Sequence, residues 1–70
     1  MIRVTKLSLN EMKQLAEVSL FSDTKDEVST TPVQDIVGFP NGYTIAQGST
    51  VMTADAEVGF MKSDGTWNWV

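Results

Sequence analysis

The C-terminal part of the chain alternates apolar and polar residues and is interrupted by turn residues. Between Gly48 and Val70, short runs rich in β-branched and aromatic residues are separated by Ala-Asp-Ala and Lys-Ser-Asp-Gly. This pattern predicts three short strands joined by two tight turns. The Asp64-Gly65 pair is the strongest turn signal, because glycine adopts a positive φ without steric cost and aspartate tolerates it. We therefore predict an antiparallel β-meander at this end of the chain.

A different period predicts a helix near the N-terminus. Ile2 and Val4 alternate with polar neighbours, which is typical of a short strand. Ser8 and Glu11 then match the capping box, in which a serine at the N-cap and a glutamate three residues later satisfy free backbone N–H groups. Apolar residues follow at helical spacing, at Leu9, Met12, Leu15, Ala16 and Leu20. The sequence thus predicts an amphipathic helix over residues 9–18 that packs on the sheet.

The middle of the chain is dominated by turn and loop signals. Residues 22–32 are polar, lack a clear period and predict a flexible connector. Residues 33–37 fit either a strand or a turn of helix. The proline and the Asn-Gly pair within residues 38–42 predict a turn, and the alternation in residues 43–46 predicts another strand.

These elements predict one small α+β domain with a short N-terminal strand, one amphipathic helix and a C-terminal antiparallel meander. The strand and helix would occupy residues 1–21, the polar connector residues 22–32 and the β-rich meander residues 33–70. A chain of 70 residues buries only about 60% of the surface that its unfolded form exposes. It contains no cysteine and no histidine, so disulfides and the common zinc ligand sets are excluded. We therefore expect oligomerisation, or docking on a larger partner, to supply stability.

Charge and hydropathy exclude several classes of partner. The net charge is −4, the acidic residues are dispersed, and no basic stripe is present. Nucleic-acid binding depends on lysine and arginine neutralising phosphates, so we expect no nucleic-acid partner. No run approaches the roughly 18 apolar residues of a membrane span, and the first residues lack the apolar region of a signal peptide. We expect synthesis in a host cytoplasm and no membrane partner.

No motif in the chain is typical of catalysis. A nucleophilic triad needs a base, which is normally histidine, to activate serine or cysteine. Asp55 with Glu57, or Asp23 with Asp26, could be considered as carboxylate pairs, but acids in turns are ordinarily solvated surface groups. The glycines lack the spacing of a phosphate-binding loop, and the acids lack that of a calcium loop. We predict no enzyme activity, no catalytic residue, no metal and no cofactor.

The aromatic residues of the meander are the candidate contact residues. By the two-residue period, Val58 and Phe60 share one face, as do Trp67 and Trp69. We predict that these four are neighbours across the Lys62–Gly65 turn, and that Met61, Asn68 and Val70 point the other way. Gly59 in the middle of a strand indicates a bulge or the close approach of a neighbouring backbone. The predicted interface consists of Tyr43, Val58, Phe60, Met61, Trp67 and Trp69.

Three interpretations of the two tryptophans stay open. They form a core contact against Phe60 and the predicted helix, a protein–protein contact, or a platform that stacks on sugar rings.

The C-terminal pattern Gly48-Ser49…Asp55…Val58-Gly59-Phe60-Met61…Asp64-Gly65-x-Trp67-x-x-Val70 resembles the terminal hairpin of small phage and prophage proteins. These include short head-fibre, decoration and other virion accessory proteins. This chain has Phe60 where a tyrosine is frequent, and Ala54-Asp55-Ala56 where a glycine-containing turn is usual. The resemblance implies a non-enzymatic virion component that is assembled in several copies, often as a trimer.

We therefore expect a structural or interaction subunit of a phage virion, which oligomerises or docks on a larger virion protein through its meander. Two alternatives belong to other classes. One is a small carbohydrate- or peptide-binding module that uses Trp67 and Trp69. The other is a small acidic regulator or inhibitor of a host protein.

Overall fold

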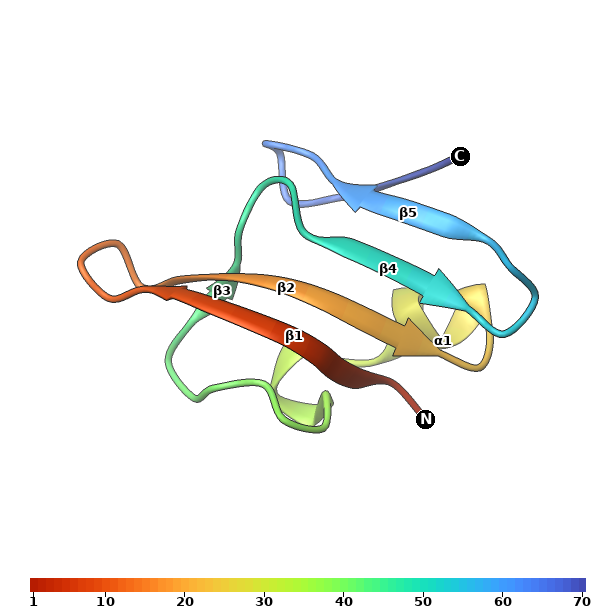
Figure 1. Cartoon of the computed structure of the whole chain (residues 1–70), viewed down its shortest axis with the longest axis horizontal. Coiled ribbons are helices and arrows are strands. Elements are labelled where there is room, and N and C mark those ends of the chain that lie inside the picture. Colours follow the sequence, from red (N-terminus) through yellow and green to blue (C-terminus); the bar gives the residue numbers. More distant parts are fainter.

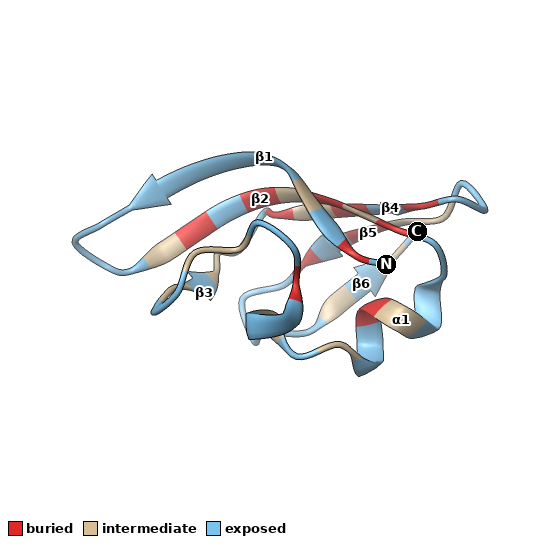
Figure 2. Ribbon diagram, turned by 90° about the horizontal axis from the view of Figure 1, so that it is seen from below, coloured by how far each residue is buried: buried red, intermediate tan, exposed pale blue.

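The computed structural model describes residues 1–70 as one six-stranded sheet with two short helical segments on one side (Figure 1). Four strands run β1-β2-β4-β5 across the sheet, β6 forms the far edge, and β3 pairs with β2. Figure 2 shows the sheet as one layer and α1, with the segment leading to β3, as a second layer beneath it. The elements are β1 Arg3–Asn10, β2 Leu15–Ser22, α1 Lys25–Thr30, the 3₁₀ turn η1 Val33–Asp35, β3 Thr44–Ile45, β4 Thr50–Thr53, β5 Val58–Met61 and β6 Trp67–Trp69. The α+β prediction is therefore correct in outline, for a protein that is mostly β-sheet.

Residues 9–18 form the end of β1, a turn and the start of β2, so the predicted helix is wrong. Leu9 pairs with Ala16 and Leu7 pairs with Val18 in an antiparallel hairpin. On β2 every second residue is buried, at Ala16, Val18, Leu20 and Ser22. Residues four apart share a face both in a helix and in a strand, so the spacing of Met12, Ala16 and Leu20 satisfied the helical pattern as well. Pairing with β1 is the long-range contact that local spacing does not contain.

The helix that does form lies inside the predicted connector. Thr24 is its N-cap, with φ −138°, and its Oγ1 accepts a hydrogen bond of 3.1 Å from the Glu27 N–H. Thr24-x-x-Glu27 has the same sequence signature that predicted a cap at Ser8 and Glu11. Val28 is buried and anchors α1 to the core. The undecided residues 33–37 contain η1.

The predicted meander is confirmed in β4, β5 and β6. Both of its turns are three-residue hairpin loops with the same hydrogen bonds. In the first, the Thr53 N–H donates to the Glu57 carbonyl at 2.9 Å and the Ala56 N–H to the Thr53 carbonyl at 3.0 Å; φ of Ala56 is 65°. In the second, the Lys62–Thr66 bond is 2.9 Å, the Gly65–Lys62 bond is 3.1 Å, and φ of Gly65 is 85°. In both loops the residue at positive φ forms the bulge that closes the hairpin.

β2 is the central strand and pairs in parallel with both β3 and β4. The strand pairing with β2 is interrupted in the segment that joins β3 to β4, and there the hydroxyl of the buried Ser49 takes the place of a backbone partner. It accepts a hydrogen bond of 3.0 Å from the Val18 N–H and lies 3.5 Å from the Ala16 carbonyl oxygen. The core beneath this strand contains Ile2, Ala16, Val18, Leu20, Val28, Ile36 and Val51. No helix of the chain is both long enough and apolar enough to cross a bilayer.

Candidate functional site

The β5–β6 register decides which aromatic side chains reach the surface. Phe60 pairs with Asn68, and Met61 pairs with Trp67, so the two tryptophans share a face with Met61 and not with Phe60. The predicted pairing of Val58 and Phe60 with the tryptophans is therefore wrong. Lys62 pairs with Thr66, so the loop consists of residues 63–65, whereas the prediction also placed Lys62 in the loop. This shift of one residue exchanges the faces of a strand.

Trp69 is a structural residue on the core side of the sheet. Its ring lies over Gly59, where an added Cβ would be 3.1 Å from the Trp69 ring and 3.1 Å from Val51. On its other side the Nζ of Lys25 is 5.0 Å from the ring centroid. The glycine predicted to permit a close backbone thus admits a side chain instead, and Trp69 links β6 to both the sheet and α1.

Trp67 borders an apolar cleft beneath the sheet. The cleft has two adjoining cavities of about 220 Å³ and 240 Å³, the first lined in part by Trp67 and the second by Tyr43. Both cavities are lined by Val33, Ile45, Met61 and Gly65. The structure therefore brings three of the predicted contact residues, Tyr43, Met61 and Trp67, to one place between η1, β3 and the β5–β6 hairpin.

The other two predicted contact residues lie on the opposite, open face of the sheet. Phe21 pairs with Met52, and Met52 pairs with Val58, so three apolar side chains form one row across β2, β4 and β5. Phe60 lies beside this row, opposite Thr50. Met52 is 52% exposed and Phe60 is 44% exposed. We call Phe21, Met52, Val58 and Phe60 the apolar row; a shallow hollow of about 300 Å³ is lined by three of them.

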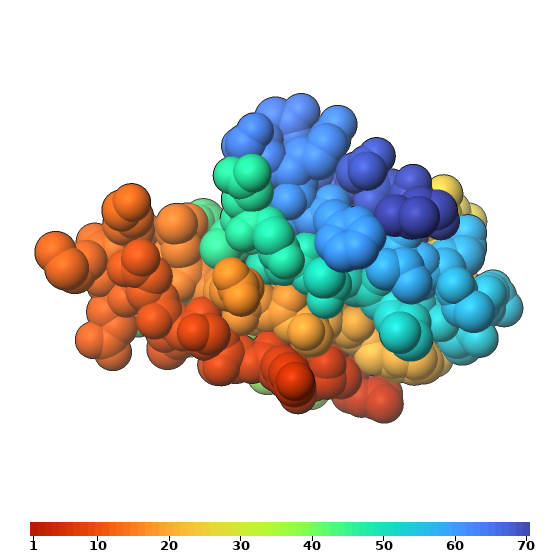
Figure 3. Space-filling view, turned by 45° about the horizontal axis from the view of Figure 1, so that its top comes forward, coloured from red at the N-terminus to blue at the C-terminus, as the bar shows by residue number.

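Neither helical segment covers the apolar row. Figure 3 views this face, on which β1, β2, β4 and β5 lie side by side (Figure 3). Charged residues lie at one margin, where the Arg3 guanidinium is 5.0 Å from the centroid of the Phe21 ring. Lys6 pairs with Ser19 and lies on the same face, as does Glu17 opposite Ser8. Two cations and one anion thus border the row, in a chain whose net charge is −4.

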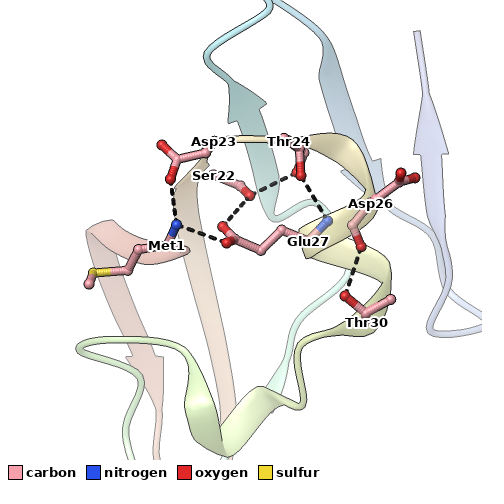
Figure 4. Close-up of polar contacts among 7 residues, drawn as sticks. All are labelled: Met1, Ser22, Asp23, Thr24, Asp26, Glu27 and Thr30. Carbon is pink, nitrogen blue, oxygen red and sulfur yellow. Dashed lines mark hydrogen bonds and ion pairs between the residues drawn. The ribbon is translucent and has the colours of Figure 1, made fainter.

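The most extensive polar cluster joins the N-terminus to α1 (Figure 4). The Met1 amino group lies 2.5 Å from Asp23 Oδ2 and 2.8 Å from Glu27 Oε2. The buried Ser22 hydroxyl donates a 2.9 Å hydrogen bond to the other oxygen of Glu27. The bonds donated by the amino group lower the pKa of Asp23 and of Glu27 and raise the pKa of the amino group itself. These ion pairs hold the start of β1 against the helix N-terminus.

The cluster has no arrangement that favours a metal ion. No group of three or more acidic, histidine or cysteine side chains converges on one point anywhere in the chain. The remaining shifted carboxyl, Asp64, accepts hydrogen bonds from the Thr66 hydroxyl at 2.7 Å and the Thr66 N–H at 3.0 Å, which lower its pKa. Its role is to fix the second hairpin loop.

Sequence reasoning did not identify Phe21 and Met52 as contact residues. Phe21 lay beyond the predicted helix of residues 9–18, and Met52 lay in a predicted strand whose faces were not assigned. The signal that identifies Phe21 is the strict alternation through residues 15–22, where Leu20 and Ser22 are buried and Phe21 lies between them. The row itself depends on the parallel pairing of β2 with β4, which no local pattern contains.

Comparison with known proteins gives no family for this fold and these surfaces. The chain matches no protein-family model, and no curated protein and no solved structure shows significant similarity to it.

Proposed function

We propose that this protein is a non-enzymatic interaction subunit that docks on a larger protein through the apolar row on the open face of its sheet. The C-terminal Asp-Gly-x-Trp pattern supports a place among phage virion accessory proteins, in which the larger protein belongs to the virion. The observation that carries the proposal is the alignment of Phe21, Met52 and Val58 on a face that no element of the chain covers.

The composition of this face fits a protein partner. The middle of a protein–protein contact is depleted of charge and enriched in aromatic residues and methionine, and the rim is polar. The apolar row has this composition, and Arg3 and Lys6 form its rim on the β1 side. The partner surface expected is an apolar patch bordered on one side by carboxylates.

The size of the face limits the affinity of a single contact. Five strands spaced about 4.8 Å apart give a width of roughly 24 Å, so the face presents on the order of 500 Å². A standard interface buries about 800 Å² on each partner. Binding should therefore depend on a few well-packed side chains, of which Phe60 and Met52 are the most exposed.

The test compares two variants of the face with a matched control. Met52→Lys and Phe60→Lys place a charge on the apolar row, whereas Val37→Lys places it at a 51% exposed apolar residue outside the row. Chemical cross-linking in a lysate of phage-producing cells identifies a partner, which is then purified and titrated with each variant. Each row variant should weaken binding by about tenfold or more, and the control should not. Equal affinity for all three variants, or absence of the chain from purified particles, would overturn the docking or the virion assignment, respectively.

A second candidate function uses the apolar cleft. Tyr43, Met61 and Trp67 border cavities whose volumes suit a bulky apolar side chain, which favours an extended peptide with such a residue over a sugar. The cleft walls offer few polar groups, and sugar recognition needs hydrogen-bond partners as well as a stacking ring. Trp69 is held between Gly59 and Lys25 and is not free to stack on a ligand.

Fluorescence of Trp67 separates the two ligand classes. The Trp69→Phe variant leaves Trp67 as the single indole in the chain. Titration with N-acetyl-leucinamide and leucine-rich tripeptides should shift its emission, while maltose should not. A response to maltose alone would favour the sugar-binding alternative, and no response to either class would remove the cleft as a ligand site.

A further inference from the structure

The free edge of the sheet at β1 carries an unused set of backbone hydrogen-bonding groups. β1 is the terminal strand, and only its beginning is covered on that side. There the Val4 N–H donates to the Val37 carbonyl at 2.9 Å and the Val37 N–H donates to the Ile2 carbonyl at 3.1 Å. A register shift between Val4 and Lys6 follows, and residues 6–10 continue with β2 as their only strand partner.

The direction of the groups beyond the shift follows from strand geometry. Within one strand, residues whose side chains point to the same face direct their N–H and C=O groups to the same edge. Ile2 and Val4 face the core and use the outer edge. Beyond the shift the core-side residues are Leu7 and Leu9, opposite Val18 and Ala16. The backbone groups of Leu7 and Leu9 therefore point outward, away from β2.

We propose that this edge pairs antiparallel with the same edge of a second copy, with Ser8 on the two-fold axis. Leu7 of one copy then pairs with Leu9 of the other, and the reverse, so that two pairs exchange four backbone hydrogen bonds. The sequence around Ser8 fits this partner because Leu-Ser-Leu reads the same in both directions. The two leucines are 46% and 43% exposed in one copy. Pairing covers them with each other, as cross-strand apolar pairs.

Charge is compatible with this register. Lys6 is the only charged residue among residues 6–10, and it pairs with the neutral Asn10 of the other copy. The two Lys6 side chains are separated by four residues along the strands, or about 14 Å. This exceeds the screening length of about 8 Å at physiological salt, so their repulsion is small. A long unpaired edge with alternating leucines and neither proline nor glycine is a template for another strand.

The pairing uses different atoms from the apolar row and does not depend on the proposed docking function. A two-fold axis perpendicular to the sheet keeps both helical layers on one side and joins both open faces into one surface. Two weak docking contacts would then act together, which raises the apparent affinity for a repetitive partner surface. The β1 edge would thus determine how many copies assemble, and the apolar row would determine which protein they bind.

Disulfide trapping tests the pairing, because the chain has no cysteine of its own. At a non-hydrogen-bonded antiparallel pair the Cα atoms are about 4.5 Å apart, which is within the range that a disulfide spans. Ser8→Cys should therefore give a covalent dimer under mild oxidation, at least about tenfold faster than the matched control Lys6→Cys, whose thiols would lie about 14 Å apart. Equal rates for the two variants would overturn the proposal.

A charge-exchange pair tests the register by sedimentation velocity over a concentration series. Leu7→Lys with Leu9→Lys places like charges opposite each other and should reduce the mass to that of one protomer. Leu7→Lys with Leu9→Glu places opposite charges across the axis and should restore the dimer. A dimer that the first double variant leaves intact, or that the second fails to restore, would overturn this register, and circular dichroism confirms that both variants are folded. Phe60→Lys should leave the dimer unchanged, which separates a failure of edge pairing from a failure of docking.

Discussion

The two faces of the β5–β6 hairpin have different surroundings, although their residues alternate along the same two strands. On the core side, Trp69 lies on Gly59 and contacts Lys25, so this face joins the sheet to α1. On the open face, Phe60 and Asn68 pair with each other and are exposed. The contrast shows that aromatic residues close in sequence divide between the core side and the exposed face according to register alone. Substitutions on the two faces should therefore separate stability from binding.

The largest difference is expected between the two aromatic truncations. Trp69→Ala removes the ring that covers Gly59 and should lower the free energy of unfolding by about 3 kcal/mol, the lower end for tryptophan because the ring is partly exposed. Phe60→Ala should change it by less than about 1 kcal/mol. Urea denaturation followed by circular dichroism measures both. A loss at Phe60 as large as that at Trp69 would contradict the assignment of the faces.

A smaller effect is expected from adding one methyl group beneath Trp69. Gly59→Ala places a Cβ 3.1 Å from both the Trp69 ring and Val51, which is closer than ordinary packing allows. The free energy of unfolding should fall by about 1–3 kcal/mol. On the open face, Asn68→Leu, which replaces the amide by methyl groups of similar size, should be close to neutral. In the Gly59→Ala, Trp69→Ala double variant the two losses should not add, since each acts on the same contact.

The two hairpin loops have different residues at the position with positive φ, and substitutions there should change stability in opposite directions. Ala56 holds a positive φ of 65° in the first loop, where an L-residue is strained, and Gly65 holds 85° in the second. Ala56→Gly should stabilise the fold by about 0.5–1 kcal/mol, and Gly65→Ala should destabilise it by about 1 kcal/mol. Thermal unfolding measures both changes. Destabilisation by Ala56→Gly would mean that the strain is absent.

The smallest effect is the pH dependence of the exposed ion pairs at the N-terminus. Asp23 and Glu27 have pKa values below their usual 3.8 and 4.5. Their contribution to stability is therefore present above the usual values and is lost as the pH falls through the lowered pKa values. The pKa of the Met1 amino group is raised above 8.0. Its contribution to stability is therefore present below pH 8.0 and is lost as the pH rises through the raised pKa. Urea midpoints should be level between about pH 5 and pH 8 and fall on both sides.

Amino-terminal acetylation provides the control for this pH dependence. It removes the charge of the amino group and should reduce the fall in urea midpoint at alkaline pH. The open-face variant Phe60→Ala should change neither the acidic nor the alkaline fall. An acetylated chain with an unchanged alkaline decline would assign that limb to other groups.

The C-terminal strands could be predicted from the sequence because their signals are local. Asp64 and Gly65 supply both the side-chain acceptor and the positive φ that the second loop needs. The capping-box pattern, in contrast, occurs twice. At Thr24 the following residues are free to form a helix, whereas at Ser8 the backbone is used in pairing with β2. Tertiary pairing overrides a local helix signal in the second case.

The candidate contact surfaces could be predicted only in part, because they depend on register. Val58 and Phe60 were correctly placed on one face, but the tryptophans were assigned to that face as well. The difference lies in Lys62, which pairs with Thr66 and is therefore not part of the loop. Phe21 and Met52 meet through a parallel pairing between segments separated by the whole α1–β3 region. Such a pairing leaves no signal in the spacing of nearby residues.

The hydroxyl of Ser49 makes one amide proton a reporter of local opening. The Val18 N–H has its acceptor on a side chain of the 46–49 loop, while its neighbours along β2 are held by backbone partners. If this loop detaches without global unfolding, the Val18 proton should exchange with solvent faster than those of Leu20 and Ala16, and Ser49→Ala should increase its rate further. The exchange rate of this one amide proton would then report how often the 46–49 loop detaches from β2.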